Sequence, residues 1–567
     1  MPISRLDAAD PPLPPLIDRE DALDRAAETA LDVLVIGGGI TGAGIALDAV
    51  SRGLRVALVE RDDLASGTSS KSSKLIHGGL RYLEQYDFNL VREAARERNR
   101  LWRLAPHLVR PLGFVVPVFS RKYQAQLKAG LTLYDTMAPF TNVHRHRALS
   151  VAGVLEAVPG LVDGIGLGGF RYFDCQTDDA RLTLQIAQAA RRLGALIVTH
   201  AEVEELLHFG RRVVGARVRD RIGGATVALT SRWTVSATGV WADRIRALSP
   251  EREAPLLTPS KGVHLSFSAR DLRVNDAALI PSGAHDRRLV FVIPWGDQVT
   301  VGTTDEQFAG DLDHPSLDAP EAAYLLHAVN EAFGVRLSLN DAVGAWAGLR
   351  PLLSGRREGA SSRDLSRRHA IFEEPPGLVT ITGGKLTTYR QMAEDLVDRI
   401  TTADGSKAPC VTARLPLGIR GHVEDALDRT RDVCRRFDID PSLAGSLLHR
   451  HGDEAPAVAA FAAAHGETDR LVDTLPYLRA EVRWAVRREL ARTLDDVLQR
   501  RMRVSLRHRE AGGHAASWAA DVLAAELRWS PAERERQLDL YLQRVRTERG
   551  VVPLDDDWRS GAVSAAG

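Results

Sequence analysis

Residues 32–60 constrain the fold more than any other part of the chain. Residues 33–36 (Val-Leu-Val-Ile) form a continuous apolar run, as a strand buried on both faces does. A glycine-rich stretch at 37–42 follows, then a helix-forming run at 43–52 and a second apolar run at 55–59. This order predicts a complete β-α-β unit within about 30 residues. The chain is therefore expected to be an α/β protein.

Three glycines in this turn match the G-x-G-x-x-G pattern of dinucleotide-binding proteins. Gly37 permits the tight turn, Gly39 lets the backbone approach a pyrophosphate, and Gly42 lets helix and strand pack closely. Glu60, 23 residues after Gly37, is placed to accept hydrogen bonds from the ribose hydroxyls. Residues 164–169 satisfy the same pattern. No buried strand precedes them and no helix follows, so we interpret them as a loop.

FAD and NAD share this fingerprint, and the rest of the chain favours FAD. NAD alone would leave the large strand-rich middle of the chain unexplained. An enzyme that used both would carry a second fingerprint in a proper strand–helix context, and we find none. FAD together with a substrate domain is the expected arrangement.

Composition and periodicity divide the chain into four regions. We expect a disordered N-terminal arm at 1–30, a FAD-dependent oxidoreductase region at 31–405, a helical domain at 410–550 and a polar tail at 551–567. Within the second region, the family resemblance described below implies FAD-binding segments at about 31–105, 185–245 and 345–405, and substrate-binding segments at about 106–184 and 246–344. The expected fold class is a Rossmann-type FAD-binding domain with a strand-rich substrate domain plus an all-α C-terminal domain, and the same resemblance implies the glutathione-reductase or D-amino-acid-oxidase type.

Charge and cysteine content exclude several classes of protein. Lys+Arg and Asp+Glu are both 74, so the chain is not a polycation that binds nucleic acid by net charge. Cys175, Cys410 and Cys434 are far apart and offer neither a disulfide framework nor a Cys-x-x-Cys metal pair. No segment reaches the roughly 18 apolar residues of a bilayer span. We expect a cytoplasmic protein with no metal site and no nucleic-acid partner.

Several ordered blocks carry a family likeness. They read GTSS at 67–70, SKLIHGGLRYL at 73–83, KGVH at 261–264, PW at 294–295, GTTD at 302–305, GLRPL at 348–352 and GGKLTTYR at 383–390, with ARTLDDVL at 491–498 in the helical part. Together they resemble the FAD-dependent glycerol-3-phosphate dehydrogenases. The resemblance implies oxidation of sn-glycerol 3-phosphate to dihydroxyacetone phosphate, in which C2 loses a hydride to flavin and its hydroxyl loses a proton.

The resemblance also assigns candidate residues around the substrate. A phosphate with nearly two negative charges needs several cations. The expected substrate-binding residues are Arg81, Tyr82 and Arg363, and the expected catalytic residues are His264, Arg350 and Lys385. His264 is the preferred base because imidazole titrates near working pH, with His77 and a neutral Lys385 as alternatives. Arg350 is expected to stabilise negative charge at O2.

Further residues are expected on the cofactor side. They are Gly37, Gly39, Gly42, Glu60, Thr68, Ser69, Ser70, His77, Gly78, Val203, Thr238, Gly239, Gly384 and Thr387. A helix expected at 386–400 would turn its N-terminal dipole toward the N1–C2 edge of the flavin.

The electron acceptor stays open between quinone and oxygen. Respiratory members of the resembled family deliver electrons to quinone at the membrane surface, and related soluble oxidases, which often carry an insertion in mid-chain, use oxygen. No such insertion is evident here, so quinone is favoured. Arg500, Arg501, Arg503, Arg507 and Arg509 form a basic stretch that suits anionic lipid headgroups, or alternatively an acid-paired helix face.

The expected partners are therefore sn-glycerol 3-phosphate, a membrane quinone, the inner face of the cell membrane as a peripheral contact, and a second copy of the chain. Two rival functions remain. One is an oxygen-using glycerol-3-phosphate oxidase, or an amino-acid oxidase of the same fold. The other is a non-catalytic nucleotide-binding scaffold whose helical domain binds a partner.

Overall fold

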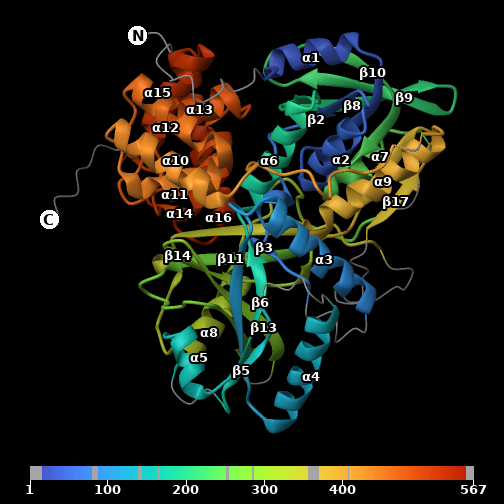
Figure 1. Ribbon diagram of the computed structural model, residues 1–567. Helices are drawn as coiled ribbons and strands as arrows, with labels where there is room; N and C mark the ends of the chain where they lie inside the picture. The colour runs from blue at the N-terminus through green and yellow to red at the C-terminus, as the bar shows by residue number, and fades with distance from the viewer. Residues whose placement is uncertain are drawn as a thin grey trace.

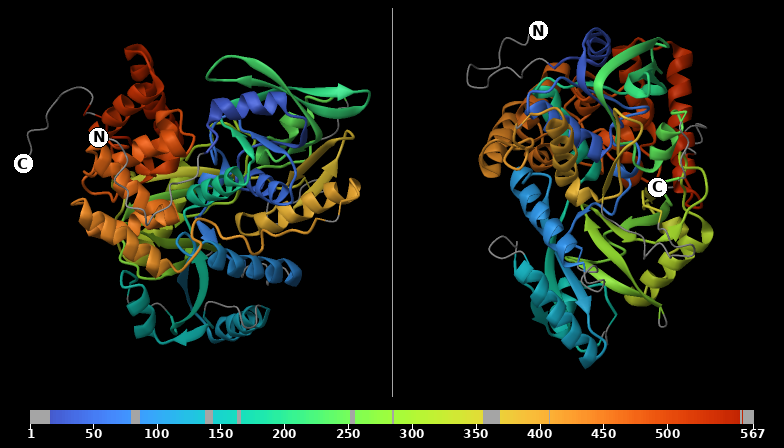
Figure 2. Two further views of the ribbon diagram at one scale, coloured as in Figure 1. Left: turned by 45° about the horizontal axis from the view of Figure 1, so that its top comes forward. Right: turned by 90° about the vertical axis from the view of Figure 1, so that its right-hand side faces the viewer.

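The computed structural model describes residues 16–79, 87–137, 144–162, 166–250, 255–283, 286–354, 369–406, 408–556 and 558. Two β-sheets lie one above the other in the view of Figure 1, and a helical domain packs beside them. Figure 2 shows that the helical domain lies closer to the first sheet than to the outer end of the second.

The first sheet contains the predicted β-α-β unit. β1 (Leu31–Ile36) pairs in parallel with β2 (Val56–Val59), and α2 (Ile40–Ser51) connects them. Among the described residues the sheet runs β17-β18-β10-β1-β2-β7. The further strands are β7 (Leu196–Val198), β8 (Ala201–Phe209), β9 (Arg212–Asp220), β10 (Thr226–Ser236), β17 (Ala370–Glu373) and β18 (Leu378–Thr382). The predicted unit is confirmed, because both strands and the helix form where the apolar runs lie.

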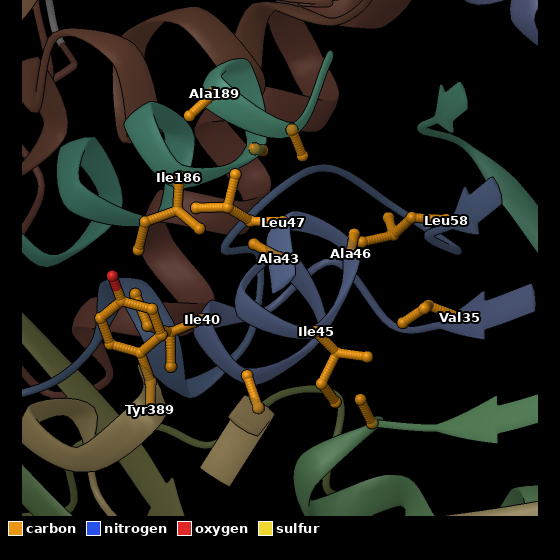
Figure 3. Packing of buried hydrophobic residues seen from close by; sticks show 14 of the residues in the cluster. Val35, Ile40, Ala43, Ile45, Ala46, Leu47, Leu58, Ile186, Ala189 and Tyr389 are labelled. Atoms are coloured by element: carbon orange, nitrogen blue, oxygen red, sulfur yellow. The ribbon is translucent and has the colours of Figure 1, made fainter. Parts of the chain in front are cut away.

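Helix α2 is buried between the sheet and two further helices. α6 (Asp179–Arg192) and α9 (Tyr389–Ala403) both pack on it. Figure 3 shows Leu47 of α2 facing Ile186 of α6, with Tyr389 at the start of α9 near Ile40. Each large aliphatic side chain buried in this way contributes about 1.5–3 kcal/mol. This packing fixes the N-terminus of α2 relative to the ends of the strands.

The second sheet is built largely from the middle of the chain. β11 (Ser260–Ser268) pairs antiparallel with β14 (Gln298–Gly302) and β16 (Gly344–Arg350). The other described strands are β3 (Leu75–Ile76), β4 (Arg110–Pro117), β5 (Arg147–Leu149), β6 (Gly169–Gln176), β12 (Ala277–Gly283), β13 (Asp286–Trp295) and β15 (Glu306–Gln307). Helices α3 (Phe88–Leu104), α4 (Arg121–Met137), α5 (Val151–Ala157) and α8 (Ala319–Phe333) surround this sheet.

The predicted segment boundaries differ from the structure at three elements. β3, expected in a FAD-binding segment, pairs with β6 in the second sheet. Residues 345–350, expected in a FAD-binding segment, belong to β16 and pair with β11 in the second sheet. Residues 179–184, expected in a substrate-binding segment, begin α6, which packs on α2. The apolar pattern identifies a strand or helix but carries no information about which sheet it joins.

The prediction of a disordered arm is wrong for residues 19–28, which form α1 (Arg19–Glu28). The side chain of Asp18 accepts a hydrogen bond from the Asp21 amide at 2.8 Å and caps the helix. The Arg19 guanidinium is buried, where it binds the Thr199 carbonyl at 2.7 Å and the carboxylate of Asp220. Distant partners therefore order this polar segment. Residues 1–15 lie outside the described residues.

The region after 410 is helical, as predicted. It contains α10 (Val423–Arg436), α11 (Ala444–His451), α12 (Ala455–His465), α13 (Ala480–Arg488), the π-helical turn η8 (Asp496–Arg501), α14 (Val504–Arg507), α15 (His514–Leu527) and α16 (Pro531–Arg549). Within the described ranges, no helix is both long and apolar enough to cross a bilayer. The polar tail expected from 551 is not wholly peripheral, because Val552 is buried in the core of the second sheet.

Three arginines of the basic stretch at 500–509 are buried and are not available on the surface. Arg500 and Arg501 are buried and bind the carboxylate of Asp63, which follows β2. Arg503 is buried as well and binds Asp178 at 2.9 Å, just before α6. Arg500, Arg501 and Arg503 thus join the helical domain to the first sheet, as the alternative of an acid-paired face predicts. Arg509 is exposed, and contact of this end of the stretch with lipid headgroups stays a prediction.

Candidate active site

A cavity of about 530 Å³ opens at the carboxyl ends of the parallel strands. Its lining includes the turn after β1, Ala237 after β10, and Ile381 and Thr382 at the end of β18. Gly262, His264 and Arg350 reach the same cavity from the second sheet. The ends of strands in an open α/β sheet are where such folds bind ligands. The volume lies within the range of small-molecule and cofactor sites, about 300–1,000 Å³.

Most of the predicted site residues meet in this one cavity. The lining contains Gly37, Gly39, Glu60, Thr68, Ser69, His77, Val203, Thr238, Gly239, His264, Arg350, Gly384, Lys385 and Thr387. The predicted substrate-binding residues Arg81, Tyr82 and Arg363 lie outside the described residues.

Three predicted cofactor residues do not line the cavity. Gly42 lies beneath the turn, where its role is the helix–strand contact that the pattern predicts. Ser70 is buried, and its hydroxyl donates to the Gly67 carbonyl at 3.3 Å. At Gly78, an added Cβ would lie 2.2 Å from the hydroxyl of Tyr134, so this glycine makes room for a tyrosine. Contact of Ser70 and Gly78 with the cofactor stays a prediction.

The glycine-rich turn has the geometry that the pattern requires. Gly37 has φ +111°, a conformation that side-chain-bearing residues rarely adopt, and an added Cβ would lie 2.8 Å from the Ala237 carbonyl oxygen. A Cβ at Gly42 would lie 1.9 Å from the Gly37 carbonyl oxygen. Gly39 is the N-cap of α2, so the helix begins in the cavity wall. First-turn N–H groups lack intrahelical partners and are suited to an anion.

Glu60 is held firmly at the end of β2. Its carboxylate accepts hydrogen bonds from the Gly38 amide at 2.6 Å and the Asp62 amide at 2.9 Å. Burial, followed by the nearby charge of Asp62, raises the pKa of Glu60. The carboxylate lines the cavity where the pattern predicts a ribose-binding acid.

The predicted hydroxyl residues also hold the cavity wall together. Ser69 Oγ accepts from the Ile40 amide at 2.9 Å, and Thr68 Oγ1 donates to the Leu349 carbonyl at 2.7 Å. Thr387 Oγ1 accepts from the His77 amide at 3.1 Å. These bonds fasten the turn at 67–70 to α2 and β16, and the start of α9 to the segment after β3. Contact of these hydroxyls with a cofactor stays a prediction.

His264 is a buried, neutral imidazole in the wall formed by β11. Its ring stacks on Trp346 with centroids 4.9 Å apart and an angle of 11° between the planes, and its Nε2 lies 2.8 Å from Ser73 Oγ. A Cβ at Gly302 would lie 2.3 Å from His264 Cδ2, so only glycine leaves room for the ring. Burial, then the charges of Lys74 and Arg350, lower the pKa of His264 well below its ordinary value. A neutral imidazole is the form that can take up a proton.

Arg350 ends β16 and lies across β11. Its guanidinium pairs with Asp305 at 3.1 Å and donates to Thr303 Oγ1 at 3.2 Å. A Cβ at Gly262 would lie 2.4 Å from Arg350 Nη2, so the glycine of the KGVH block provides the path for this side chain. The side chain remains 26% exposed and lines the cavity. The predicted cations Arg350 and Lys385 thus reach one cavity from separate elements.

Sequence reasoning did not identify the residues that support His264. Ser73, Lys74 and Trp346 surround its ring, directly or through one another. Ser73 and Lys74 lie within the SKLIHGGLRYL block, which is the only signal that marks them. The described residues contain no group of three or more His, Cys, Asp or Glu side chains arranged to hold a metal ion.

Comparisons with known proteins agree with this geometry. A family model described as FAD dependent oxidoreductase matches residues 32–398, and one described as the C-terminal domain of alpha-glycerophosphate oxidase matches 410–534. The glycerol-3-phosphate dehydrogenase of Mycobacterium leprae is 42% identical over 535 residues, 94% of this chain and 90% of that protein. The chain belongs to the FAD-dependent glycerol-3-phosphate dehydrogenase family.

Other members of this family match along nearly the same length. The mitochondrial glycerol-3-phosphate dehydrogenase SDP6 of Arabidopsis thaliana is 36% identical over 549 residues, 92% of this chain and 87% of that protein. The structure of the Bacillus halodurans glycerol-3-phosphate dehydrogenase complexed with FAD has a TM-score of 0.78 at 29% identity, and covers 94% of this chain and 97% of that one. An L-α-glycerophosphate oxidase from Mycoplasma pneumoniae, with a TM-score of 0.54 at 20% identity, shares the fold.

FAD is the cofactor of this family, and the cavity fits it. Gly39, which has no side chain, and the first turn of α2 form a site suited to an anion. Glu60, His264 and Lys385 line the same cavity. The predicted fold class and the predicted cofactor are confirmed.

Proposed function

We propose that this protein oxidises sn-glycerol 3-phosphate to dihydroxyacetone phosphate and passes the electrons to a quinone. The observation that carries the proposal is the continuity of the cavity. The same cavity is lined by the dinucleotide turn with Glu60 and by a neutral histidine with Arg350. The names of the relatives support the substrate, because they are glycerol-3-phosphate dehydrogenases over most of the length of this chain.

Bound FAD supplies the acceptor for the hydride that leaves C2. The turn at 37–39 and Glu60 would hold its adenosine and pyrophosphate, and Thr387, Gly384 and Lys385 line the part of the wall that would meet the ring. A cofactor held by both sheets fixes where the substrate carbon must lie.

The residues of the second sheet then act on the substrate. His264 is neutral and can take the proton of the C2 hydroxyl. The guanidinium of Arg350 stabilises the negative charge that grows on that oxygen as the proton leaves. Lys385 adds a second cation to the wall, which suits a phosphorylated substrate.

The quinone acceptor and a peripheral position on the inner face of the membrane are the finer part of the proposal. The quinone acceptor is supported by the names of the two sequence relatives described above, which are those of dehydrogenases. The buried arginines at 500–503 give no support to a membrane contact. The predicted second copy of the chain stays a prediction.

An oxidase is the second candidate, because the family model that matches residues 410–534 carries an oxidase's name. Anaerobic mixing of the FAD-loaded protein with glycerol 3-phosphate tests both. We expect the flavin absorbance to bleach, and to return on addition of a quinone faster than on addition of oxygen. Hydrogen peroxide released at the rate of substrate loss would favour the oxidase. A flavin that glycerol 3-phosphate does not bleach would contradict the proposed substrate, and protein that stays colourless after refolding with FAD would favour the scaffold.

A further inference from the structure

His264 lines the cavity, but neither of its ring nitrogens is presented freely to it. Nε2 lies 2.8 Å from Ser73 Oγ. Nδ1 is buried and has no hydrogen-bond partner among the described residues. One face of the ring stacks on Trp346, and the Cδ2 edge lies against Gly302. A substrate hydroxyl in the cavity therefore needs an intermediary to reach this base.

Ser73 is in the position of that intermediary. It is only partly buried and lines the cavity, while its hydroxyl oxygen contacts Nε2. A serine hydroxyl donates one hydrogen bond and accepts others at the same time. It can therefore accept from an alcohol in the cavity while it donates to the imidazole behind it.

The backbone on both sides of Ser73 is fixed. The amide and hydroxyl of Ser72 donate to the carboxylate of Asp179 at 3.0 and 2.7 Å. The amide of Lys74 donates to Ser72 Oγ at 2.9 Å, and its carbonyl accepts from Thr177 at 2.9 Å. Lys74 has φ +59°, so the chain bends sharply directly after Ser73. A relay group has to be held in this way, because proton transfer requires hydrogen-bond distances on both sides.

We propose that Ser73 is a catalytic residue that relays the proton of the C2 hydroxyl to His264, an inference that rests on the proposed function. The substrate O–H bond breaks and its proton passes to Ser73 Oγ, while the Ser73 proton passes to His264 Nε2. The C2–H bond breaks with its electron pair going to the flavin, and the electron pair of the O–H bond forms the C2=O bond. The imidazolium returns the proton to solvent after product leaves. Ser73 ends the step with the proton it received.

A double-mutant cycle tests the relay. Flavin reduction by glycerol 3-phosphate is measured in single turnovers for the wild type, Ser73→Ala, His264→Ala and the double variant. Because both residues serve one proton path, each single change is expected to slow reduction by about 10²–10⁴. The double variant should be no slower than the slower single variant. Ser73→Thr keeps a hydroxyl and should restore most of the rate.

Ser266→Ala is the matched control. Ser266 lies two residues after His264 on β11, and its buried hydroxyl donates to Gln298 at 2.6 Å away from the cavity lining. Its loss removes a buried serine hydroxyl from the same strand and should leave the rate of flavin reduction unchanged.

Three results would overturn the relay. The first is a rate of flavin reduction in Ser73→Ala within twofold of the wild-type rate. The second is a double variant whose rate is reduced by the product of the two single reductions. The third is a wild-type rate that depends linearly on the fraction of D₂O in the solvent, which indicates that one proton is transferred instead of two. The last measurement needs no variant, so it decides even if Ser73→Ala loses FAD. Failure of the proposed function looks different, because glycerol 3-phosphate would then not reduce the wild-type flavin at all.

Discussion

Arg350 and the arginines at 500–503 are all candidate cations in the sequence, but their surroundings in the structure differ. Arg350 lies in the cavity wall, pairs with Asp305 and keeps 26% of its side chain exposed. Arg500, Arg501 and Arg503 lie where the helical domain meets the first sheet, a region we call the domain seam, and are at most 5% exposed. The seam arginines bind carboxylates of Asp63 and Asp178 that precede them by more than 300 residues.

The comparison separates the seam arginines, whose ion pairs stabilise the fold, from Arg350, which is available to a ligand. Burying an ion is costly unless partners compensate it, so a buried pair tolerates the loss of neither partner. A cation that still reaches a cavity contributes less to folding and can respond to charge that appears there. Changing one partner in each set should therefore affect different properties.

Asp63→Ala is expected to have the largest effect, on stability. Arg501 would keep the Glu489 carbonyl, which it binds at 2.7 Å, but would lose its buried carboxylate. Leaving a buried charge uncompensated costs about 3–5 kcal/mol. Chemical denaturation followed by circular dichroism measures the free energy of unfolding.

The matched control for this change is Asp521→Ala. Asp521 pairs with Arg534 at 2.9 Å on the surface of the helical domain and is 64% exposed. An exposed pair contributes about 0–1 kcal/mol. Equal losses for Asp63→Ala and Asp521→Ala would remove the distinction between the seam and the surface.

Arg350→Met is expected to act on catalysis. The rate of flavin reduction should fall by about 10²–10³, as it does when one donor to a developing oxyanion is removed. Stability should change less than for Asp63→Ala, because Asp305 still accepts from Ser260 Oγ at 2.6 Å. FAD absorbance should remain, because the turn at 37–42 is untouched. Single-turnover absorbance measures the rate of flavin reduction, and thermal unfolding measures the stability. An unchanged rate would exclude Arg350 from catalysis.

The cofactor half of the cavity could be predicted from sequence because its geometry is local. Gly37, Gly42 and Glu60 lie within one β-α-β unit, so spacing alone fixes their relation. The catalytic half is assembled from distant segments. Ser73 and His264 are 191 residues apart, and no spacing rule connects them. The partners of the seam arginines could not be predicted for the same reason, since Arg500 and Asp63 are 437 residues apart and no spacing rule connects them.

Lys74 offers the finest test of the difference between structural and catalytic charge, because it belongs to both regions. Its ammonium lies 3.4 Å from Asp179, beside the seam, and 4.5 Å from the centroid of the Trp346 ring on which His264 stacks. Burial lowers the pKa of Lys74 to about 8, so the group is charged throughout the acid range in which His264 titrates. Its charge is one of the causes that lower the pKa of His264.

Lys74→Met should therefore raise the pKa of His264. The base works only when neutral, so the rate of flavin reduction falls as pH drops through this pKa. In Lys74→Met the fall in rate should begin at a pH higher by about one unit or less. One pH unit corresponds to about 1.4 kcal/mol of interaction with the protonated imidazole. The rate should drop at the acid end of the profile, where His264 titrates, and hold at pH 8. Lys261→Met, which removes a lysine from β11 that pairs with Glu321 at 2.8 Å, should leave the position of the fall unchanged. If the fall in rate of Lys74→Met occurs at the wild-type pH or at a lower pH, Lys74 has a structural role at the seam and does not tune His264.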